Sequence, residues 1–387
     1  MIVREIQNKV LRLVEKFPII AITGPRQSGK TTLSKIIKPN YKYVNLENLS
    51  DREFALNDPI GFLETYRNGV IIDEIQNVPS LFSYLQVITD ERNINGEYII
   101  TGSHNFLLME KITQSLAGRV AIFTLLPFSI NELKNTAYKI DNWENYLLSG
   151  SYPRKIIQNI EASDYYDNYL KTYIERDVRL LKNITNLDLF QKFIKLLAGR
   201  VGQLFNQTSL GNELGLDNKT INAWFTVLET SFITYRLQPY HSSFNKRLTK
   251  TPKIYFYDTG LLCHLLRINS RVELDLHFAK GNLFENLVIT ELYKNAINDD
   301  LKQNLYFWRD SSQNEVDIII EIGSKIEAIE IKSGKTIHSN FFKGLDYFSK
   351  QTLNQKQISL NLVYGGSENQ KRTAANVRSV YNLPNLM

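Results

Sequence analysis

An apolar strand followed at once by a glycine-rich loop constrains this chain more than any other feature. The run Ile19–Thr23 predicts a buried strand, and the residues from Gly24 to Thr31 match the pattern G-x-x-x-x-G-K-[ST] at every position. Such a loop wraps an anion with backbone N–H groups, and the next helix directs its positive end at the same point. The residues expected to bind the phosphates are Gly24, Pro25, Arg26, Gln27, Ser28, Gly29, Lys30, Thr31 and Thr32.

A second apolar run, Val70–Ile72, ends in two acids. Lys30 would place positive charge on the phosphates of ATP, while Thr31 and Asp73 would hold Mg²⁺. Glu74 would act as the general base that polarises the attacking water. Two acids after a strand are otherwise an ordinary solvated loop, so this interpretation depends on the phosphate-binding loop upstream. ATP and Mg²⁺ are the expected cofactors, and ATP hydrolysis is the expected reaction.

Two further residues are candidates for the ATP site because of where they lie relative to these motifs. Ser103 follows the predicted strand Tyr98–Thr101, at a place where the ATPases that this chain resembles keep a polar residue beside the γ-phosphate, although a serine there would equally cap the following helix. Arg119 ends a predicted helix just before a strand that starts at Val120. Here the chain resembles AAA+ ATPases, and the resemblance implies that Arg119 reaches the nucleotide of a neighbouring subunit in a homo-oligomer. The alternatives are action within its own chain and an arginine that only interacts with the helix dipole.

Four charged residues in the C-terminal part form another pattern. Glu285 lies on a predicted helix, Asp317 begins an apolar strand, and the strand period of two places Glu330 and Lys332 on one face. In this order they resemble the Asp…Glu-x-Lys set of PD-(D/E)xK nucleases. The resemblance implies that the three acids are metal ligands and that Lys332 activates the attacking water. A Glu-x-Lys pair on a sheet is otherwise a weak ion pair, so cleavage stays an open question.

The middle of the chain predicts a helix-turn-helix followed by a two-stranded hairpin. A helix starts at Asp217 after a turn at Gly215, and strands are expected at Ile233–Tyr240 and Lys253–Tyr257. This order favours a winged helix-turn-helix that contacts the phosphate backbone of DNA or RNA. The residues expected at that contact are Asn218, Lys219, Thr220, Asn222, Lys246, Arg247, Lys250 and Lys253. Winged helices also serve as packing modules, which is the alternative.

Strands and helical patterns alternate from Pro18 to Leu125, which predicts an α/β fold with a parallel sheet. We expect four parts: a P-loop AAA+ parallel-sheet domain over 1–130, a helical lid and connector over 131–189, the winged helix-turn-helix over 190–266, and a restriction-endonuclease-like α/β domain over 267–387. The whole arrangement resembles a family of prokaryotic AAA+ ATPases that carry a C-terminal domain of unknown function.

Composition limits the partners and the cellular location that can be expected for the protein. A net charge of +6 over 387 residues permits contact with nucleic acid without establishing it. The single cysteine, Cys263, excludes an intramolecular disulfide and is expected to be buried, which fits a reducing, cytoplasmic location. No apolar run is long enough to span a membrane, so no membrane partner is expected.

Together these patterns predict a Mg²⁺-dependent AAA+ ATPase whose ATP cycle is coupled to nucleic-acid binding or processing. The competing hypothesis is a regulatory nucleotide switch, in which ATP rearranges a protein-interaction platform and the Glu285, Asp317, Glu330 and Lys332 group is inert.

Overall fold

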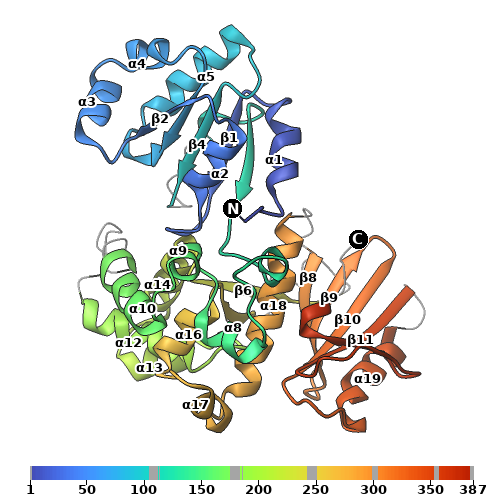
Figure 1. Cartoon of the computed structure of the whole chain (residues 1–387). Helices are drawn as coiled ribbons and strands as arrows, with labels where there is room; N and C mark the ends of the chain where they lie inside the picture. Colours follow the sequence, from blue (N-terminus) through green and yellow to red (C-terminus); the bar gives the residue numbers. More distant parts are fainter. Residues whose placement is uncertain are drawn as a thin grey trace. The chain divides into compact units, whose positions relative to one another are not determined.

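The computed structural model describes residues 2–103, 112, 114–174, 184, 186–241, 251–298, 304–352 and 357–383 (Figure 1). The chain divides into two compact units. The first comprises Met1–Phe128 with the short pieces Tyr152–Arg154 and Thr230–Phe232, and the second comprises Ser129–Ser151, Lys155–Glu229 and Ile233–Met387. No described helix is both long enough and apolar enough to cross a membrane.

The first unit is built on a five-stranded parallel sheet. Its strands are β1 (Ile19–Thr23), β2 (Lys42–Asn45), β3 (Val70–Asp73), β4 (Tyr98–Gly102) and β5 (Val120–Thr124), in the spatial order β2-β3-β4-β1-β5. Its helices are α1 (Gln7–Val14), α2 (Lys30–Ile37), α3 (Leu49–Asn57), α4 (Pro59–Thr65), the 3-10 turn η1 (Ile75–Asn77) and α5 (Leu81–Arg92). The predicted α/β fold with a parallel sheet is confirmed for this part of the chain.

Both faces of this sheet are covered by helices, as expected for parallel strands that read as continuous apolar runs. Helices α1 and α2 pack on the face that carries Ile20 and Ile22, and α3, α4 and α5 pack on the face that carries Ile19 and Ala21. Because the strands are parallel, the carboxyl ends of β1, β3 and β4 meet at one edge. The residues that follow Thr23 and Asp73, and Ser103 after Gly102, therefore lie at the same edge of the sheet.

The second unit combines helices with a larger sheet. Its helices are α7 (Ile130–Lys134), α8 (Trp143–Ser149), α10 (Ala162–Tyr169), the π-helix η2 (Leu170–Ile174), α12 (Leu187–Ala198), α13 (Gln207–Leu214), α14 (Asn218–Thr230), α16 (Thr259–Leu265), α17 (Arg271–Leu276), α18 (Lys280–Asn298), the 3-10 turns η4 (Ser339–Phe342) and η5 (Val380–Asn382), and α19 (Lys343–Thr352). A short helix, α9 (Pro153–Ile157), lies at the junction of the two units along the chain. Cys263 of α16 is buried, as the sequence predicted.

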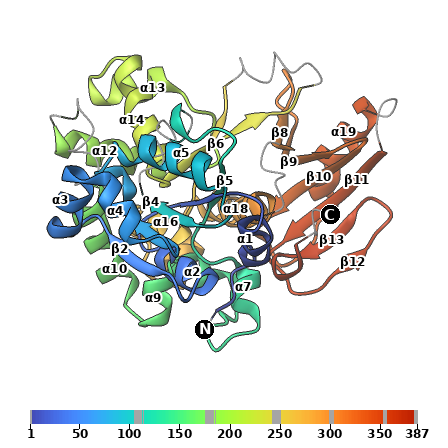
Figure 2. The same ribbon diagram turned by 90° about the horizontal axis from the view of Figure 1, so that it is seen from above.

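The strands of the second unit form one eight-stranded sheet in the order β12-β13-β11-β10-β9-β8-β6-β7 (Figure 2). They are β6 (Thr234–Pro239), β7 (Lys253–Phe256), β8 (Leu305–Arg309), β9 (Glu315–Ile322), β10 (Lys325–Lys332), β11 (Gln357–Tyr364), β12 (Gln370–Lys371) and β13 (Asn376–Ser379). Strand β10 is antiparallel to β9 and parallel to β11. Helix α19 packs against β9 and β10 through Leu345 and Phe348.

The hairpin that the sequence assigned to a wing is part of this sheet. Strand β6 pairs with β7 in antiparallel fashion and with β8 in parallel fashion at Gln238↔Tyr306 and Pro239↔Phe307. The side-chain amide of Asn286 in α18 bonds to both backbone groups of Phe256 in β7, accepting from its N–H at 2.8 Å and donating to its C=O at 3.0 Å. The hairpin is therefore anchored on both sides rather than free to project.

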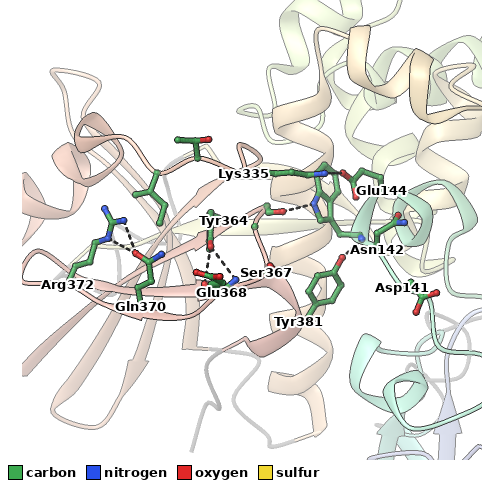
Figure 3. A pocket seen from close by; sticks show the side chains of 15 residues that line it. Asp141, Asn142, Glu144, Lys335, Tyr364, Ser367, Glu368, Gln370, Arg372 and Tyr381 are labelled. Carbon is green, nitrogen blue, oxygen red and sulfur yellow. Dashed lines mark hydrogen bonds and ion pairs between the residues drawn. The ribbon is translucent and has the colours of Figure 1, made fainter.

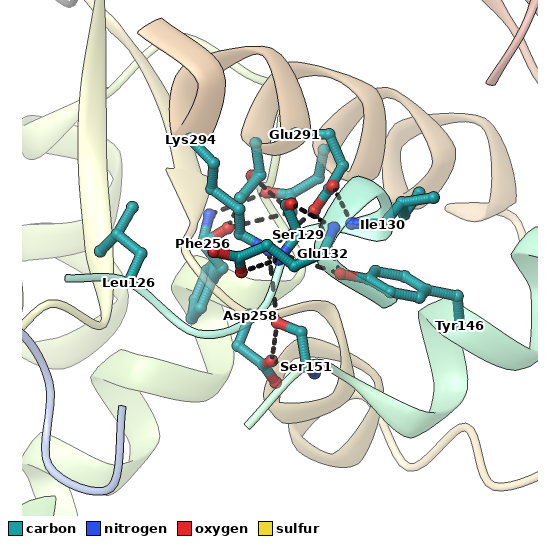
Figure 4. Close-up of polar contacts among 12 residues, drawn as sticks. Leu126, Ser129, Ile130, Glu132, Tyr146, Ser151, Phe256, Asp258, Glu291 and Lys294 are labelled. Atoms are coloured by element: carbon teal, nitrogen blue, oxygen red, sulfur yellow. Dashed lines mark hydrogen bonds and ion pairs between the residues drawn. The ribbon is translucent and has the colours of Figure 1, made fainter. Parts of the chain in front are cut away.

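A buried ion pair fastens the start of the second unit to α18 (Figure 4). Lys294 and Glu291 lie 2.7 Å apart and are each about 5% exposed or less. Glu291 also accepts from the backbone N–H of Ile130 at 2.6 Å and from the hydroxyl of Tyr146 at 3.2 Å, and Lys294 donates to Ser151 at 3.3 Å. Because a buried charge must be paired and hydrogen-bonded, this network fixes α7 and α8 against α18.

Candidate functional site

The glycine-rich loop takes the shape that an anion cradle needs. Gly24 and Gly29 adopt φ values of 144° and 96°, which favour glycine, and Gln27 is also left-handed at 63°. A Cβ atom on Gly24 would lie 2.2 Å from the backbone oxygen of Leu125, so no larger residue fits there. Lys30 begins α2 and donates to the backbone oxygens of Gly24 at 3.1 Å and Pro25 at 2.9 Å. The ammonium thus lies over the loop.

The remaining predicted contacts differ in exposure. Pro25 and Ser28 are buried, Arg26 pairs with Glu47 at 3.5 Å, and Thr32 is exposed. The side-chain hydroxyl of Ser28 is fully buried and has no hydrogen-bond partner in the described part of the chain. A buried hydroxyl without a partner is uncommon in a folded protein, and it lies here inside the loop expected to hold phosphates.

Asp73 collects hydroxyl groups from three separate elements. Its Oδ2 accepts from Thr31 at 2.7 Å and from Tyr43 of β2 at 2.7 Å, and its Oδ1 accepts from Thr101 of β4. Burial, reinforced by the hydrogen bond to Asp73, raises the pKa of Tyr43, so this phenol acts as a donor at neutral pH. The structure therefore brings together Thr31 and Asp73, the pair that the sequence assigned to Mg²⁺.

Glu74 is held in a conformation that few residues adopt. Its φ of 53° is left-handed, which for a non-glycine residue costs energy and often marks a functional site. One oxygen accepts from Gln76 and from the hydroxyl of Ser103 at 3.0 Å, while the backbone N–H of Ser103 lies at 3.4 Å. Ser103 thus contacts the predicted base directly, and its place beside a γ-phosphate stays a prediction.

Arg119 lies at the opposite end of the same sheet. Val120, the next residue, pairs with Ile19 at the start of β1, whereas the phosphate-binding loop follows Thr23 at its end. The guanidinium of Arg119 makes two hydrogen bonds of 2.6 Å to the carboxylate of Asp90 in α5. A strand length of roughly 15 Å therefore separates Arg119 from the loop of its own chain.

Arg4 holds the backbone of the loop in place, and no sequence pattern pointed to this contact. Its guanidinium donates to the backbone oxygens of Ser28 at 2.8 Å and Leu126 at 2.5 Å, and it stacks 4.9 Å from the ring centroid of Phe128. The side chain is buried, so these bonds are shielded from water. An arginine in an N-terminal segment carries no local signal of such a contact, because its partners are distant backbone atoms.

The C-terminal residues form a second polar cluster. The register Ile318↔Ile329 brings Asp317 of β9 beside Glu330 of β10. Glu330 pairs with Lys332 at 2.5 Å, and its other oxygen, Oε2, is buried without a hydrogen-bond partner in the described residues. Burial, together with the charge of Asp317, raises the pKa of Glu330 to about 8. Burial would lower the pKa of Lys332, but the charges of Asp317 and Glu330 outweigh it and raise that pKa.

Glu285 belongs to the same cluster but is occupied. It accepts from the hydroxyl of Tyr255 at 2.6 Å and from Lys253 at 3.3 Å, and burial raises its pKa to about 7. Among the described residues, no group of three or more His, Cys, Asp or Glu side chains is placed to hold a metal ion. The predicted three-acid metal set is therefore not assembled. Two of its members have protein partners: Glu285 as described above, and Asp317, which accepts from the backbone N–H of Ile331 at 2.7 Å.

The predicted nucleic-acid contacts are only partly described. Lys246, Arg247 and Lys250 lie outside the described residues. The prediction that Lys253 decorates a wing is wrong, because this side chain is 3% exposed and pairs with Glu285 and Glu315. In the second helix, Asn218, Lys219 and Asn222 are exposed.

Comparison with known sequences defines the class of the first unit. Residues 16–134 match a family described as AAA domain, so this part of the chain is a P-loop domain of the AAA type. Residues 140–272 and 280–386 match two domains of unknown function, DUF8612 and DUF4143.

Two relatives that match most of the chain carry the description uncharacterized protein. A protein of Mycobacterium tuberculosis is 29% identical over 337 residues, which cover 86% of this chain and 74% of the relative. A protein of Haemophilus influenzae is 23% identical and covers 73% of this chain and 76% of its own length. Among solved structures, a Walker-type ATPase of Pyrococcus abyssi is 15% identical with a TM-score of 0.45, and it covers 69% of this chain and 96% of its own.

Proposed function

We propose that the first unit binds ATP and hydrolyses it with Mg²⁺. The observation that carries this proposal is the 2.7 Å hydrogen bond between Thr31 and Asp73, beside Lys30. A hydroxyl and a carboxylate side by side are the oxygen ligands that Mg²⁺ takes in P-loop sites. The ion would neutralise charge on the β- and γ-phosphates.

The protein groups around that point have distinct roles in this proposal. The backbone N–H groups of the Gly24 to Lys30 loop would bind the phosphates, and Lys30 would turn from the loop carbonyls to them. Glu74 would accept the proton of the attacking water, with Ser103 holding its carboxylate in place. A base fixed by a direct hydrogen bond needs little reorganisation when the reaction proceeds.

The direct test compares steady-state ATP turnover in the wild type, Lys30→Ala and Glu74→Gln. We expect Lys30→Ala to weaken nucleotide binding and Glu74→Gln to bind ATP with little change but lose turnover by about 100-fold or more. Lys42→Ala, an exposed lysine on β2, serves as the matched control. Equal turnover in all four proteins would overturn the proposal.

We further propose that ATP turnover is coupled to nucleic acid through the second unit. The support is the order of α12, α13, α14 and the β6–β7 hairpin, with exposed polar side chains at Asn218 and Lys219 of α14. Single- or double-stranded DNA or RNA would then change the ATP turnover rate, and Lys219→Glu would reduce that change. A rate indifferent to every nucleic acid would favour the regulatory switch.

Phosphodiester cleavage is a second candidate, favoured by one observation. The Oε2 atom of Glu330 is buried and has no hydrogen-bond partner in the described residues, so a cation in this proposal would be held by Glu330 and Asp317 without Glu285. Asp317 lies beside it, and Lys332 would orient a water.

Incubation of plasmid, single strands and RNA in Mg²⁺ or Mn²⁺ tests this candidate. Cleavage that Asp317→Ala abolishes, and that the exposed control Asp346→Ala retains, would establish it. If neither protein cleaves any substrate, the Glu330 cluster is inert, and the switch hypothesis gains support.

A further inference from the structure

A buried cation from the hairpin lies inside the C-terminal acid cluster. Lys253, the first residue of β7, is 3% exposed, and its ammonium lies 3.3 Å from Oε1 of Glu285 and 2.5 Å from Oε1 of Glu315. A pocket of about 630 Å³ opens where β10 and β11 end, and none of these three residues lines it (Figure 3). The ammonium is therefore held by the chain's own carboxylates and does not belong to that pocket.

Neighbouring side chains fix this cation and its partners. Tyr255 follows two residues later on the same face of β7 and donates its hydroxyl to Oε1 of Glu285 at 2.6 Å, the oxygen that Lys253 also contacts. The ring centroid of Phe307 lies 5.5 Å from the ammonium. Burial would lower the pKa of Lys253, but the nearby carboxylates, of which Glu285 acts most strongly, outweigh it and raise that pKa. Lys253 is therefore a permanent cation at neutral pH.

The charges of the cluster do not balance without this ammonium. The cluster holds four carboxylates, Glu285, Glu315, Asp317 and Glu330, and three cations, Lys253, Lys332 on Glu330 and Arg309 at 3.5 Å from Glu315. Taking Lys253 away leaves four negative and two positive charges, a difference of two, which is the charge of one divalent ion. A buried charge that loses its partner is costly, so the cluster needs a cation at this place.

We propose that the Lys253 ammonium occupies the place of a second metal ion in this cluster. Glu285 and Glu315 then hold a cation that is part of the chain, and a divalent ion is left with Asp317 and Glu330 as ligands. A lysine ammonium is a compact point charge that suits two carboxylates, as a small divalent ion does. This occupant also accounts for the three-acid set that is not assembled among the described residues. Neither ATP hydrolysis nor cleavage is needed for this role, because it concerns only which cations the acids hold.

Titration of Mn²⁺ into the nucleotide-free full chain, with the free ion measured by electron paramagnetic resonance, tests this role. Lys253→Met removes the charge and keeps the length of the side chain, so it should bind one more Mn²⁺ ion per chain than the wild type. Lys325→Met, at an exposed position on β10, is the matched control and should bind the same number as the wild type. The phosphate-binding loop is intact in all three proteins, so any Mn²⁺ that it binds cancels in the comparison.

Thermal unfolding keeps the test decisive where Lys253→Met is unstable. Without their counter-charge the carboxylates should repel one another, which lowers the melting temperature. Mn²⁺ should then raise the melting temperature of Lys253→Met by more than that of the wild type, because the ion replaces the lost charge. Lys253→Met combined with Glu285→Gln removes one acid together with the base. This double variant should be more stable than Lys253→Met in the absence of metal, and it should lose the additional Mn²⁺ ion.

Three results would overturn the proposal. Lys253→Met could bind no more Mn²⁺ than the wild type, or it could stay unfolded when Mn²⁺ is added. The double variant could also retain the additional ion, in which case Glu285 is not its ligand. ATP turnover and nucleic-acid cleavage are not measured in these experiments, so their outcome is independent of the proposed function.

Discussion

At the scale of single residues, the candidate ATP site depends on contacts made by distant parts of the chain. Asp73 is oriented by Thr31, Tyr43 and Thr101, which come from α2, β2 and β4. The motif residues were predictable because local spacing determines them. Tyr43 and Thr101 were not, because only the strand order places them beside Asp73.

Arg4 should control the shape of the phosphate-binding loop. Its planar guanidinium bridges the carbonyls of Ser28 and Leu126, and an ammonium cannot hold two oxygens in the same way. We expect Arg4→Lys to weaken ATP binding by about tenfold, equivalent to about 1.4 kcal/mol, and Arg4→Met to weaken it further. Nucleotide titration measures the effect, with the exposed Arg12→Ala as the control. Unchanged affinity in Arg4→Met would show that the loop holds its own shape.

The raised pKa of Glu330 predicts that the free energy of unfolding falls as the pH rises. Burial and the charge of Asp317 raise this pKa from 4.5 to about 8, so the folded protein binds the proton more tightly than the unfolded chain does. The stabilisation that comes from this tighter proton binding is complete below about pH 4.5 and is lost as the pH rises through about 8. Between about pH 5 and 9 the wild type should lose at least 1 kcal/mol more stability than Glu330→Gln. Urea titrations at several pH values measure this, and parallel curves for the two proteins would contradict it.

At the scale of secondary-structure elements, the sequence pattern correctly located the strands and the turn that are compared next. The expected strands at Tyr98–Thr101 and Ile233–Tyr240 agree with β4 and β6 to within one residue at each end, and the expected turn at Gly215 separates α13 from α14. What failed was the assignment of the hairpin to a free wing. Pairing of β6 with β8 joins residues far apart in the chain, and local periodicity contains no information about it. The ion-pair partners of Lys253 could not be predicted for the same reason, because they too are distant in the chain.

Helix α19 starts so close to β9 that only glycine fits at its second residue. A Cβ atom on Gly344 would lie 2.4 Å from the backbone oxygen of Glu315 and 3.3 Å from Oε2 of Glu330. Gly344→Ala should therefore destabilise the second unit by about 1–3 kcal/mol.

Gly281 of α18 provides the matched control for Gly344. A Cβ there meets nothing within 4 Å, so Gly281→Ala should be neutral or stabilising by up to about 1 kcal/mol. Thermal unfolding of both variants measures the difference. Equal melting temperatures would show that the start of α19 moves freely.

At the scale of the whole molecule, the position of Arg119 leads to a prediction about contacts between copies of the chain. It lies at the opposite end of the sheet from its own phosphate-binding loop, so a contact with nucleotide would have to be made to another copy. Arg119→Ala should then lower turnover by 10²-fold or more without altering ATP affinity.

Mixing variants tests this arrangement directly. Lys30→Ala retains Arg119 but lacks a working loop, and Arg119→Ala is the reverse. If the arginine acts between chains, mixtures of the two should recover part of the wild-type turnover, which neither shows alone. No recovery in mixed oligomers would leave Arg119 as the ion-pair partner of Asp90 and nothing more.

Strand β6 joins the hairpin to the rest of the sheet, so the second unit should not fold as two separate pieces. It hydrogen-bonds to β7 on one side and β8 on the other, and Asn286 seals the outer edge of β7. If the chain were expressed as two fragments divided after residue 266, the first fragment would contain β6 without its partner β8. The second fragment would contain β8 without its partner β6. Each would tend to aggregate alone, and soluble material would require both pieces to be expressed together.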